Sequence, residues 1–289
     1  MKKVALTVLI LIFLFCLGCS PAEESFRIVA TTLPVYEFTA VLCDGTDLSV
    51  GRLVTDNVSC LHDYTLQVTQ MRMVEDADVI VISGAGLEGF LDDALHNKNC
   101  IDASLHLHIH SAASHDHDDH GHAHDADPHI WLSPENAKGM AENICEGLSA
   151  KYPAYGDTFH QNLEILLQQL DALQTYGETT LSQLSCREII TFHDGFGYFA
   201  ESFDLEVLEA VEEEAGSEAS AMELIHLSEL IQAHGLPAIF TERSGSTASA
   251  SIISRETNTL IYTLDMAMAG ESYFDAMYHN IDTVKEALK

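Results

Sequence analysis

Short apolar runs alternate along the first half of the chain with longer segments in which apolar residues recur every three or four positions. Strand-like runs cover residues 27–32, 47–54, 79–82 and 101–103, and helical spacings cover 34–43, 66–76 and 87–95. The run at 79–82 is apolar throughout, which is typical of a strand buried on both faces of a parallel sheet. This alternation predicts a first lobe of stacked βα units.

The same alternation begins again after residue 185. Strand-like runs cover 188–192, 206–211, 238–241 and 260–264, and helical spacings cover 196–203, 221–234, 246–257 and 273–288. A second set of βα units predicts a second lobe. Because ligands of such lobes bind at the carboxyl ends of parallel strands, a site between the lobes would collect residues that follow strands.

A long amphipathic segment separates the two sets. Between residues 155 and 184, leucines and one phenylalanine keep a spacing of three or four that is interrupted only at Gly177. About 28 helical residues would reach roughly 42 Å, which is longer than one small lobe. A coiled coil is the alternative, but the repeat is short. The pattern predicts an α/β protein with lobes at 26–154 and 185–289, each a mainly parallel sheet flanked by helices, joined by one linking helix at 155–184.

The first 18 residues have the pattern of an export signal. Two lysines precede an apolar stretch that is too short for a stable membrane span, and Leu17-Gly18-Cys19 follows it. A cysteine after Leu-Gly matches the lipobox of bacterial lipoproteins, whereas an ordinary cleaved signal is the alternative. We therefore expect acylation of Cys19, a short tether over 19–25, and a lipoprotein held to the bilayer outside the cytoplasm.

The chain is strongly acidic. It has 13 basic and 45 acidic side chains in 289 residues, a formal net charge of −32, and loss of the two signal lysines would make this −34. Nucleic acid is excluded as a natural partner, because phosphate binding needs the opposite sign. The charge favours solubility and raises the concentration of cations near the surface.

The cysteines do not indicate a metal site of their own. If Cys19 carries lipid, five remain in the mature chain, and no two form a CxxC pair. Disulfides are compatible with a location outside the membrane, but the spacing leaves their pairing open. The five are Cys43, Cys60, Cys100, Cys145 and Cys186.

Eight of the 16 histidines lie in one short segment, where aspartates alternate with them. They are His106, His108, His110, His115, His117, His120, His122 and His124. Because this segment has few large apolar residues, burial cannot offset the entropy of ordering it, and we expect a disordered loop over 106–126. Histidine-rich tracts are typical of metal binding, so the loop is predicted to collect metal ions weakly.

Four polar residues stand where predicted strands or the loop end: His62, His129, His193 and Asp265. Residues in such places face a shared crevice in an α/β protein. Three imidazoles and one carboxylate would complete a tetrahedral site of the kind that zinc prefers, whereas manganese prefers more oxygen ligands. An aspartate at a strand end also commonly caps a helix, which is the alternative for Asp265.

The motifs around these residues are specific. The strongest is Asp127-Pro128-His129-Ile130-Trp131-Leu132-Ser133-Pro134, and others are Ala30–Pro34, His62–Tyr64, Thr191–Phe199 and Phe240–Glu242. With them the chain resembles, over about residues 26–289, the zinc and manganese solute-binding lipoproteins of bacterial ABC transporters, the ZnuA-type family.

The resemblance implies two α/β lobes that flank a rigid linking helix, with the metal between them. It places the family's three histidines on His62, His129 and His193, and its C-terminal carboxylate on Asp265. Manganese members tend to have a carboxylate at the third position, so His193 favours transported Zn²⁺ over Mn²⁺. Leu61 stands where the family usually has proline, which changes loop geometry and not a ligand. A water or another carboxylate takes the fourth place in some zinc members.

The sequence therefore predicts an extracytoplasmic high-affinity zinc receptor that delivers Zn²⁺ to the permease of an ABC importer, works as a monomer and is not an enzyme. A manganese or iron receptor of the same type, a metal-dependent adhesin and a metal chaperone are the alternatives. A zinc hydrolase could use three histidines to activate water. However, the chain has no HExxH motif and no general base that can be named.

Overall fold

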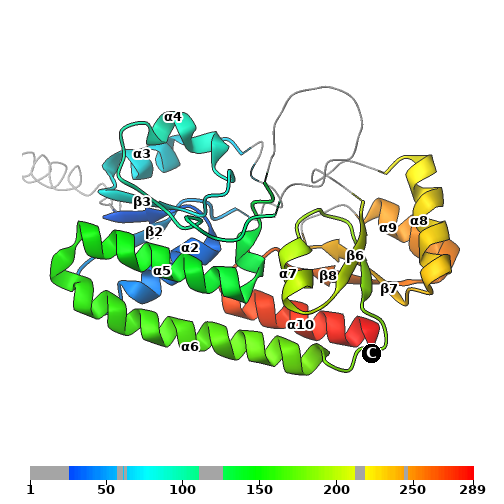
Figure 1. Cartoon of the computed structure of the whole chain (residues 1–289). Coiled ribbons are helices and arrows are strands. Elements are labelled where there is room, and N and C mark those ends of the chain that lie inside the picture. Colours follow the sequence, from blue (N-terminus) through cyan, green and yellow to red (C-terminus); the bar gives the residue numbers. More distant parts are fainter. Residues whose placement is uncertain (1–25, 57–60, 62–63, 111–125, 212–218, 244–246) are drawn as a thin grey trace, which may run out of the picture.

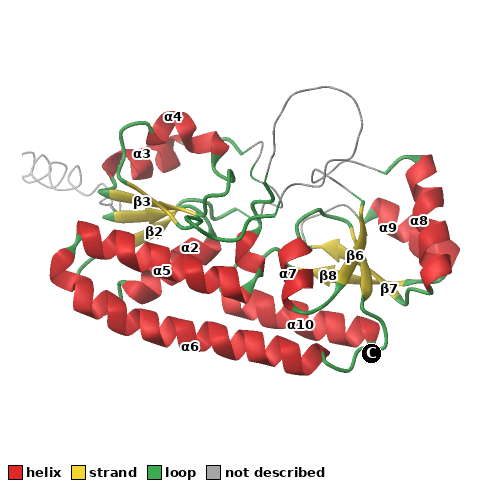
Figure 2. Cartoon of the chain, in the orientation of Figure 1, coloured by secondary structure: helices red, strands yellow, loops and turns green. Residues whose placement is uncertain are grey.

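The computed structural model describes residues 26–56, 61, 64–110, 126–211, 219–243 and 247–289. Its N-terminal lobe contains a four-stranded parallel sheet in the order β2-β1-β3-β4. The strands are β1 (Ile28–Ala30), β2 (Val50–Arg52), β3 (Val79–Ile82) and β4 (Cys100–Asp102). The helices of this lobe are α2 (Leu33–Leu42), α3 (Val68–Asp76), α4 (Asp92–Leu95) and α5 (Pro134–Lys151) (Figure 2).

The C-terminal lobe repeats this architecture. Its parallel sheet has the order β6-β5-β7-β8. The strands are β5 (Glu188–Thr191), β6 (Glu206–Ala210), β7 (Ala238–Glu242) and β8 (Leu260–Leu264). The helices are α7 (Gly197–Ser202), α8 (Ala221–His234), α9 (Ala248–Thr257) and α10 (Tyr273–Leu288). Two parallel sheets flanked by helices confirm the predicted fold class.

The sheets are buried on both faces, as the apolar runs predict. In β3, Val79 and Val81 belong to the core shared with α2 and α5, whereas Ile80 between them packs with Val74 of α3 on the other face. In β5, Ile190 packs under α8 and α9. Because neighbouring strand residues point to opposite faces, a continuous apolar run is what such a strand requires.

The linking helix is α6 (Gly156–Leu181), a single helix of 26 residues that runs beneath both lobes (Figure 1). It packs against α2 and α5 of one lobe and α10 of the other. Gly177 does not interrupt it. A β-carbon at Gly177 would lie 2.1 Å from the Phe203 ring, so glycine is required there for the C-terminal lobe to approach the helix.

Direct contacts also join the two lobes. The indole N–H of Trp131 donates to the Met266 carbonyl over 2.7 Å, and the Tyr273 hydroxyl donates to the Trp131 carbonyl over 2.8 Å. All three residues are buried, with Trp131 and Tyr273 fully so. The lobes are thus joined through a shared core, which restricts their relative motion.

One predicted helix differs from the structure. The spacing at 87–95 predicts one helix, but a 3₁₀ turn at Gly89–Leu91 comes first and α4 has only four residues. The reason is Glu88, whose carboxylate turns back to accept the backbone N–H groups of Ser83 and Gly84. The segment before residue 89 is therefore held as a loop.

Two further observations concern the described part of the chain. No helix in it has the length and apolar character needed to cross a bilayer. Cys43, Cys100, Cys145 and Cys186 are free thiols in the structure. Cys19, Cys60 and the export signal lie outside the described residues.

Candidate metal centre

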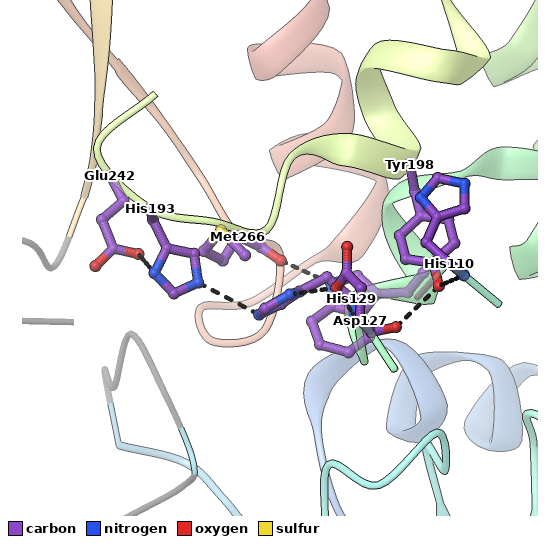
Figure 3. A network of polar contacts seen from close by, with 8 residues as sticks. His110, Asp127, His129, His193, Tyr198, Glu242 and Met266 are labelled. Carbon is purple, nitrogen blue, oxygen red and sulfur yellow. Dashed lines mark hydrogen bonds and ion pairs between the residues drawn. The ribbon is translucent and has the colours of Figure 1, made fainter. Parts of the chain in front are cut away.

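Two buried imidazoles from different lobes meet at the centre of the molecule. His129 directly precedes the 3₁₀ turn Ile130–Leu132, and His193 follows strand β5. Their Nε2 atoms lie 3.3 Å apart, and the residues are only 5% and 2% exposed (Figure 3). The structure therefore brings together two of the four predicted ligands, which are 64 positions apart in the sequence.

Asp127 fixes the orientation of the first imidazole. Its Oδ1 accepts the backbone N–H of His129 at 2.9 Å and lies 2.8 Å from the Nδ1 atom of the same ring. Because an ionised carboxylate can only accept a hydrogen bond, Nδ1 carries the proton and donates to Asp127, which leaves the Nε2 lone pair directed toward His193. A carboxylate behind an imidazole in this way is the usual outer-shell arrangement of a metal-binding histidine.

Glu242 occupies the equivalent place behind the second imidazole. Its Oε2 lies 3.9 Å from Nδ1 of His193, and both side chains are buried. Glu242 ends β7, and β5 and β7 are neighbours at the point where the strand order of the sheet reverses. Ligands of open α/β sheets bind at this point, so topology alone places both residues at the crevice.

The separation of the two Nε2 atoms matches a shared metal ion. Two nitrogens bound at about 2.0–2.1 Å to one tetrahedral zinc lie about 3.3 Å apart. Two lone pairs directed at each other across the observed 3.3 Å repel unless a proton or cation lies between them. The pair is therefore arranged to accept a cation.

Gly195 allows the chain to pass close to both rings. A β-carbon at this position would lie 2.8 Å from Cδ2 of His193 and 3.0 Å from Nδ1 of His129. It would also lie 2.7 Å from the Met266 methyl carbon. Any side chain at position 195 would therefore displace one of the two imidazole rings or the Met266 side chain.

The other two predicted ligands are placed differently. Asp265 follows β8 and is 8% exposed, but its carboxylate accepts the Ala267 N–H at 2.8 Å and lies 3.1 Å from the Arg243 guanidinium. Within the described ranges, no group of three potential ligand atoms that lie within 4.8 Å of one another includes Asp265. His62 lies outside the described residues. The assignment of both as ligands remains a prediction.

The beginning of the histidine-rich loop needs a correction. His106, His108 and His110, predicted to be disordered, have defined positions. The His108 carbonyl accepts from Asn136 at 3.3 Å, and the His110 N–H donates to the Tyr198 hydroxyl at 2.8 Å. Composition could not reveal these distant partners. The remaining five predicted loop ligands lie outside the described residues: His115, His117, His120, His122 and His124.

The sequence reasoning did not assign a role to Asp127 or Glu242. Both had a signal that could have indicated one. Asp127 stands two positions before a candidate ligand, close enough for its carboxylate to reach the ring. Glu242 ends an apolar strand, the same criterion that selects His193 and Asp265.

Two parallel α/β lobes, joined by a long helix and meeting at a buried histidine pair, define the class of two-lobed solute-binding proteins. Residues 28–287 match the family described as zinc-uptake complex component A, periplasmic (ZnuA). The chain belongs to this family, whose members are solute-binding proteins of metal ABC transporters.

Individual relatives agree with this assignment. The zinc-binding lipoprotein AdcA of Streptococcus pneumoniae serotype 4 (strain ATCC BAA-334 / TIGR4) is 30% identical over 307 residues, which cover 99% of this chain and 61% of AdcA. The chain thus spans about three fifths of that relative. A crystal structure of ZnuA superposes with a TM-score of 0.79 at 26% identity, covering 92% of this chain and 100% of that one. The Zn(II)-bound ZnuA-like domain of S. pneumoniae AdcA gives 0.76 at 26% identity, covering 92% and 99%.

Proposed function

We propose that this protein is an extracytoplasmic zinc receptor that binds Zn²⁺ between its lobes and delivers it to the permease of an ABC importer. The observation that carries the proposal is the 3.3 Å separation of the His129 and His193 Nε2 atoms. A carboxylate stands on the Nδ1 side of each ring. The relative AdcA is described as zinc-binding, and its ZnuA-like domain as Zn(II)-bound, which supports the same cargo here.

The complete ligand set that we propose is His62, His129, His193 and Asp265. For Asp265 to bind the ion, its carboxylate would have to exchange the Arg243 guanidinium, now 3.1 Å away, for the metal. A water molecule in the fourth place is the alternative. Two or three imidazoles favour zinc over manganese, because Mn²⁺ prefers oxygen ligands. Zinc also competes with protons for imidazole nitrogen, so affinity should fall as the pH drops below about 6.5.

The parts of the chain outside the described residues complete the proposal. Acylation of Cys19 would hold the receptor, as a monomer, to the outer side of the cytoplasmic membrane. The loop histidines at 115–124 would bind Zn²⁺ weakly and raise its concentration near the ordered site. Because the lobes share a core through Trp131, release would need contact with the transporter or a local loop movement.

Calorimetric titration of the apo protein with Zn²⁺ tests the proposal. We expect one tight equivalent, and we expect His129→Ala to weaken it at least about tenfold, because one of the few metal ligands is lost. His226→Ala is the matched control, since His226 is exposed on α8, a helix at the outer end of the C-terminal lobe (Figure 1). An unchanged tight equivalent in His129→Ala would refute the site. A tighter equivalent for Mn²⁺ than for Zn²⁺ would refute the cargo.

A further inference from the structure

A second group of metal-binding side chains lies outside the buried histidine pair. In the described part of the chain, His108, His110 and Glu201 form the one group of three potential ligands whose atoms all lie within 4.8 Å of one another. His108 and His110 come from the N-terminal lobe after β4, whereas Glu201 is on α7 of the C-terminal lobe. We propose that these three residues form a second divalent-cation site that bridges the two lobes.

His110 is held in place by four contacts that do not involve a metal. Its backbone N–H donates to the Tyr198 hydroxyl at 2.8 Å, and its carbonyl accepts the Asp127 N–H at 3.0 Å. Its ring stacks on Tyr198, with centroids 4.0 Å apart and planes 9° from parallel (Figure 3). Its Nε2 lies 2.7 Å from Oε2 of Glu201. The ring is therefore oriented in advance, which reduces the entropy that a metal ion would have to offset on binding.

His108 brings a second imidazole to the same place. Its ring lies edge-on to that of His110, with centroids 5.3 Å apart and an interplanar angle of 77°. Its carbonyl accepts from the Asn136 side chain of α5, which anchors the backbone on the N-terminal lobe. Both histidines are thus attached through their backbones, and an ion would replace the direct contact between Nε2 of His110 and Glu201.

The chemistry of the group selects a class of metal. Two imidazoles and one carboxylate, with an open fourth position, suit Zn²⁺ and the similar ions Co²⁺ and Ni²⁺ better than Mg²⁺ or Ca²⁺, which prefer oxygen ligands. His108 and Glu201 are exposed, and the Glu201 side chain is 62% exposed. Exposure favours weaker binding and faster exchange than at the buried pair. The alternative is an ion pair between His110 and Glu201 alone, and it would not account for a second imidazole, that of His108, at the same place.

The second site is connected to the first through two residues. The Tyr198 hydroxyl accepts from His110 and donates to the Asp127 carbonyl at 2.8 Å, and the Asp127 carboxylate holds His129. An ion at the second site would therefore pin the segment that orients the first imidazole and would cross-link the lobes. This proposal does not depend on the buried pair being the transport site.

Zinc titration of the full chain by calorimetry tests the second site through two variants that remove different ligands. Glu201→Gln and His108→Ala should each lower the affinity for one of the weakly bound zinc ions at least about tenfold. The affinity for the tightly bound zinc ion should not change. Glu229→Gln, which changes another exposed helical glutamate, is the matched control and should titrate like the wild type. Repeating the titration with residues 111–125 replaced by a Gly/Ser linker removes the other loop histidines. In that background one weak equivalent should remain, and Glu201→Gln should abolish it.

Two outcomes would overturn the proposal. One is that Glu201→Gln and His108→Ala titrate like Glu229→Gln in both backgrounds, which would leave only an ion pair between His110 and Glu201. The other is that no weak equivalent remains in the linker background while thermal unfolding shows an intact fold. Loss of the tight equivalent in His129→Ala, described above, is a separate result that tests the proposed function alone.

Discussion

The two lobes have the same strand order but use the same position in the fold differently. In the N-terminal sheet, β1 and β3 flank the point where the order reverses, and Thr31, Thr32 and Ser83 follow these strands. Thr32 and Ser83 pair through their hydroxyls at 2.8 Å, and Thr31 donates to Glu88 at 2.7 Å. In the C-terminal sheet, the corresponding position holds His193 and Glu242.

The difference lies in which way the polar atoms point. In the N-terminal lobe, Glu88 accepts three hydrogen bonds from its own lobe, so this polar cluster is closed on itself. In the C-terminal lobe, the carboxylate stands behind an imidazole whose Nε2 faces His129 of the other lobe. The topology provides two equivalent positions, and the side chains turn one into a structural contact and the other into half of a candidate metal centre.

The largest expected effect is on metal affinity at the C-terminal position. His193→Ala should lower zinc affinity about 100-fold or more, because the buried site loses a proposed ligand and the C-terminal lobe no longer provides an imidazole opposite His129. The double change Thr32→Val and Ser83→Ala at the N-terminal position should leave affinity within about threefold. Calorimetry of both proteins checks the contrast. An equal loss of zinc affinity in His193→Ala and in the double variant would show that the two lobes do not differ in the proposed way.

A smaller effect is expected from the carboxylate behind the first imidazole. Asp127→Ala should lower zinc affinity about 10- to 100-fold, because outer-shell partners set the orientation and tautomer of a ligand. Glu242→Gln should lower zinc affinity less. The Glu242 oxygen lies 3.9 Å from Nδ1 of His193, whereas the Asp127 oxygen lies 2.8 Å from Nδ1 of His129. Competition with a fluorescent zinc chelator would rank the two. A larger loss in Glu242→Gln would reverse the assigned roles.

The smallest effect is a change in stability with no change in metal binding. Burial raises the pKa of Glu88 from 4.5 to about 7. A carboxyl whose pKa is raised on folding gives stability that is complete below about pH 4.5 and is lost as the pH rises through 7. Each pKa unit corresponds to about 1.4 kcal/mol. The wild type should therefore lose more unfolding free energy between pH 5 and pH 8 than Glu88→Gln does.

Urea unfolding at the two pH values measures this difference. Glu229→Gln is a suitable control, because it makes the same chemical change at an exposed side chain in place of a buried one. The same change in unfolding free energy from pH 5 to pH 8 in Glu88→Gln and wild type would contradict the role given to burial. Zinc affinity should be unchanged in Glu88→Gln, which would separate the structural position of the N-terminal lobe from the candidate metal-binding position of the C-terminal lobe.

Much of the fold was predictable from the sequence, and the reasons are physical. Strands buried on both faces give continuous apolar runs such as 79–82, and each predicted strand overlaps one in the structure. The position of His193 followed from a general property of parallel sheets, whose carboxyl ends meet at one crevice, whereas His129 was selected by its place at the end of the loop in a specific motif. The helix predicted at 87–95 begins two residues later and as a 3₁₀ turn, because Glu88 turns back on the preceding loop.

The finer parts of the site depend on contacts that no local pattern encodes. The position of His110 depends on Tyr198, 88 residues away, so composition alone predicted disorder where the structure has an anchored segment. Asp127 and Glu242 stand at positions that could have been noticed in the sequence, but the contact of each carboxylate with an imidazole Nδ1 depends on the orientation of that ring. His62 and Asp265 remain predictions from sequence.

Diffraction from zinc-loaded crystals at the zinc absorption edge tests the central claim most directly. We expect an anomalous difference peak between the lobes, about 2.0–2.1 Å from the Nε2 atoms of both His129 and His193. The remaining ligands around that peak would decide between Asp265 and water. A fully occupied zinc elsewhere, with these two nitrogens still facing each other across an empty gap, would contradict the account.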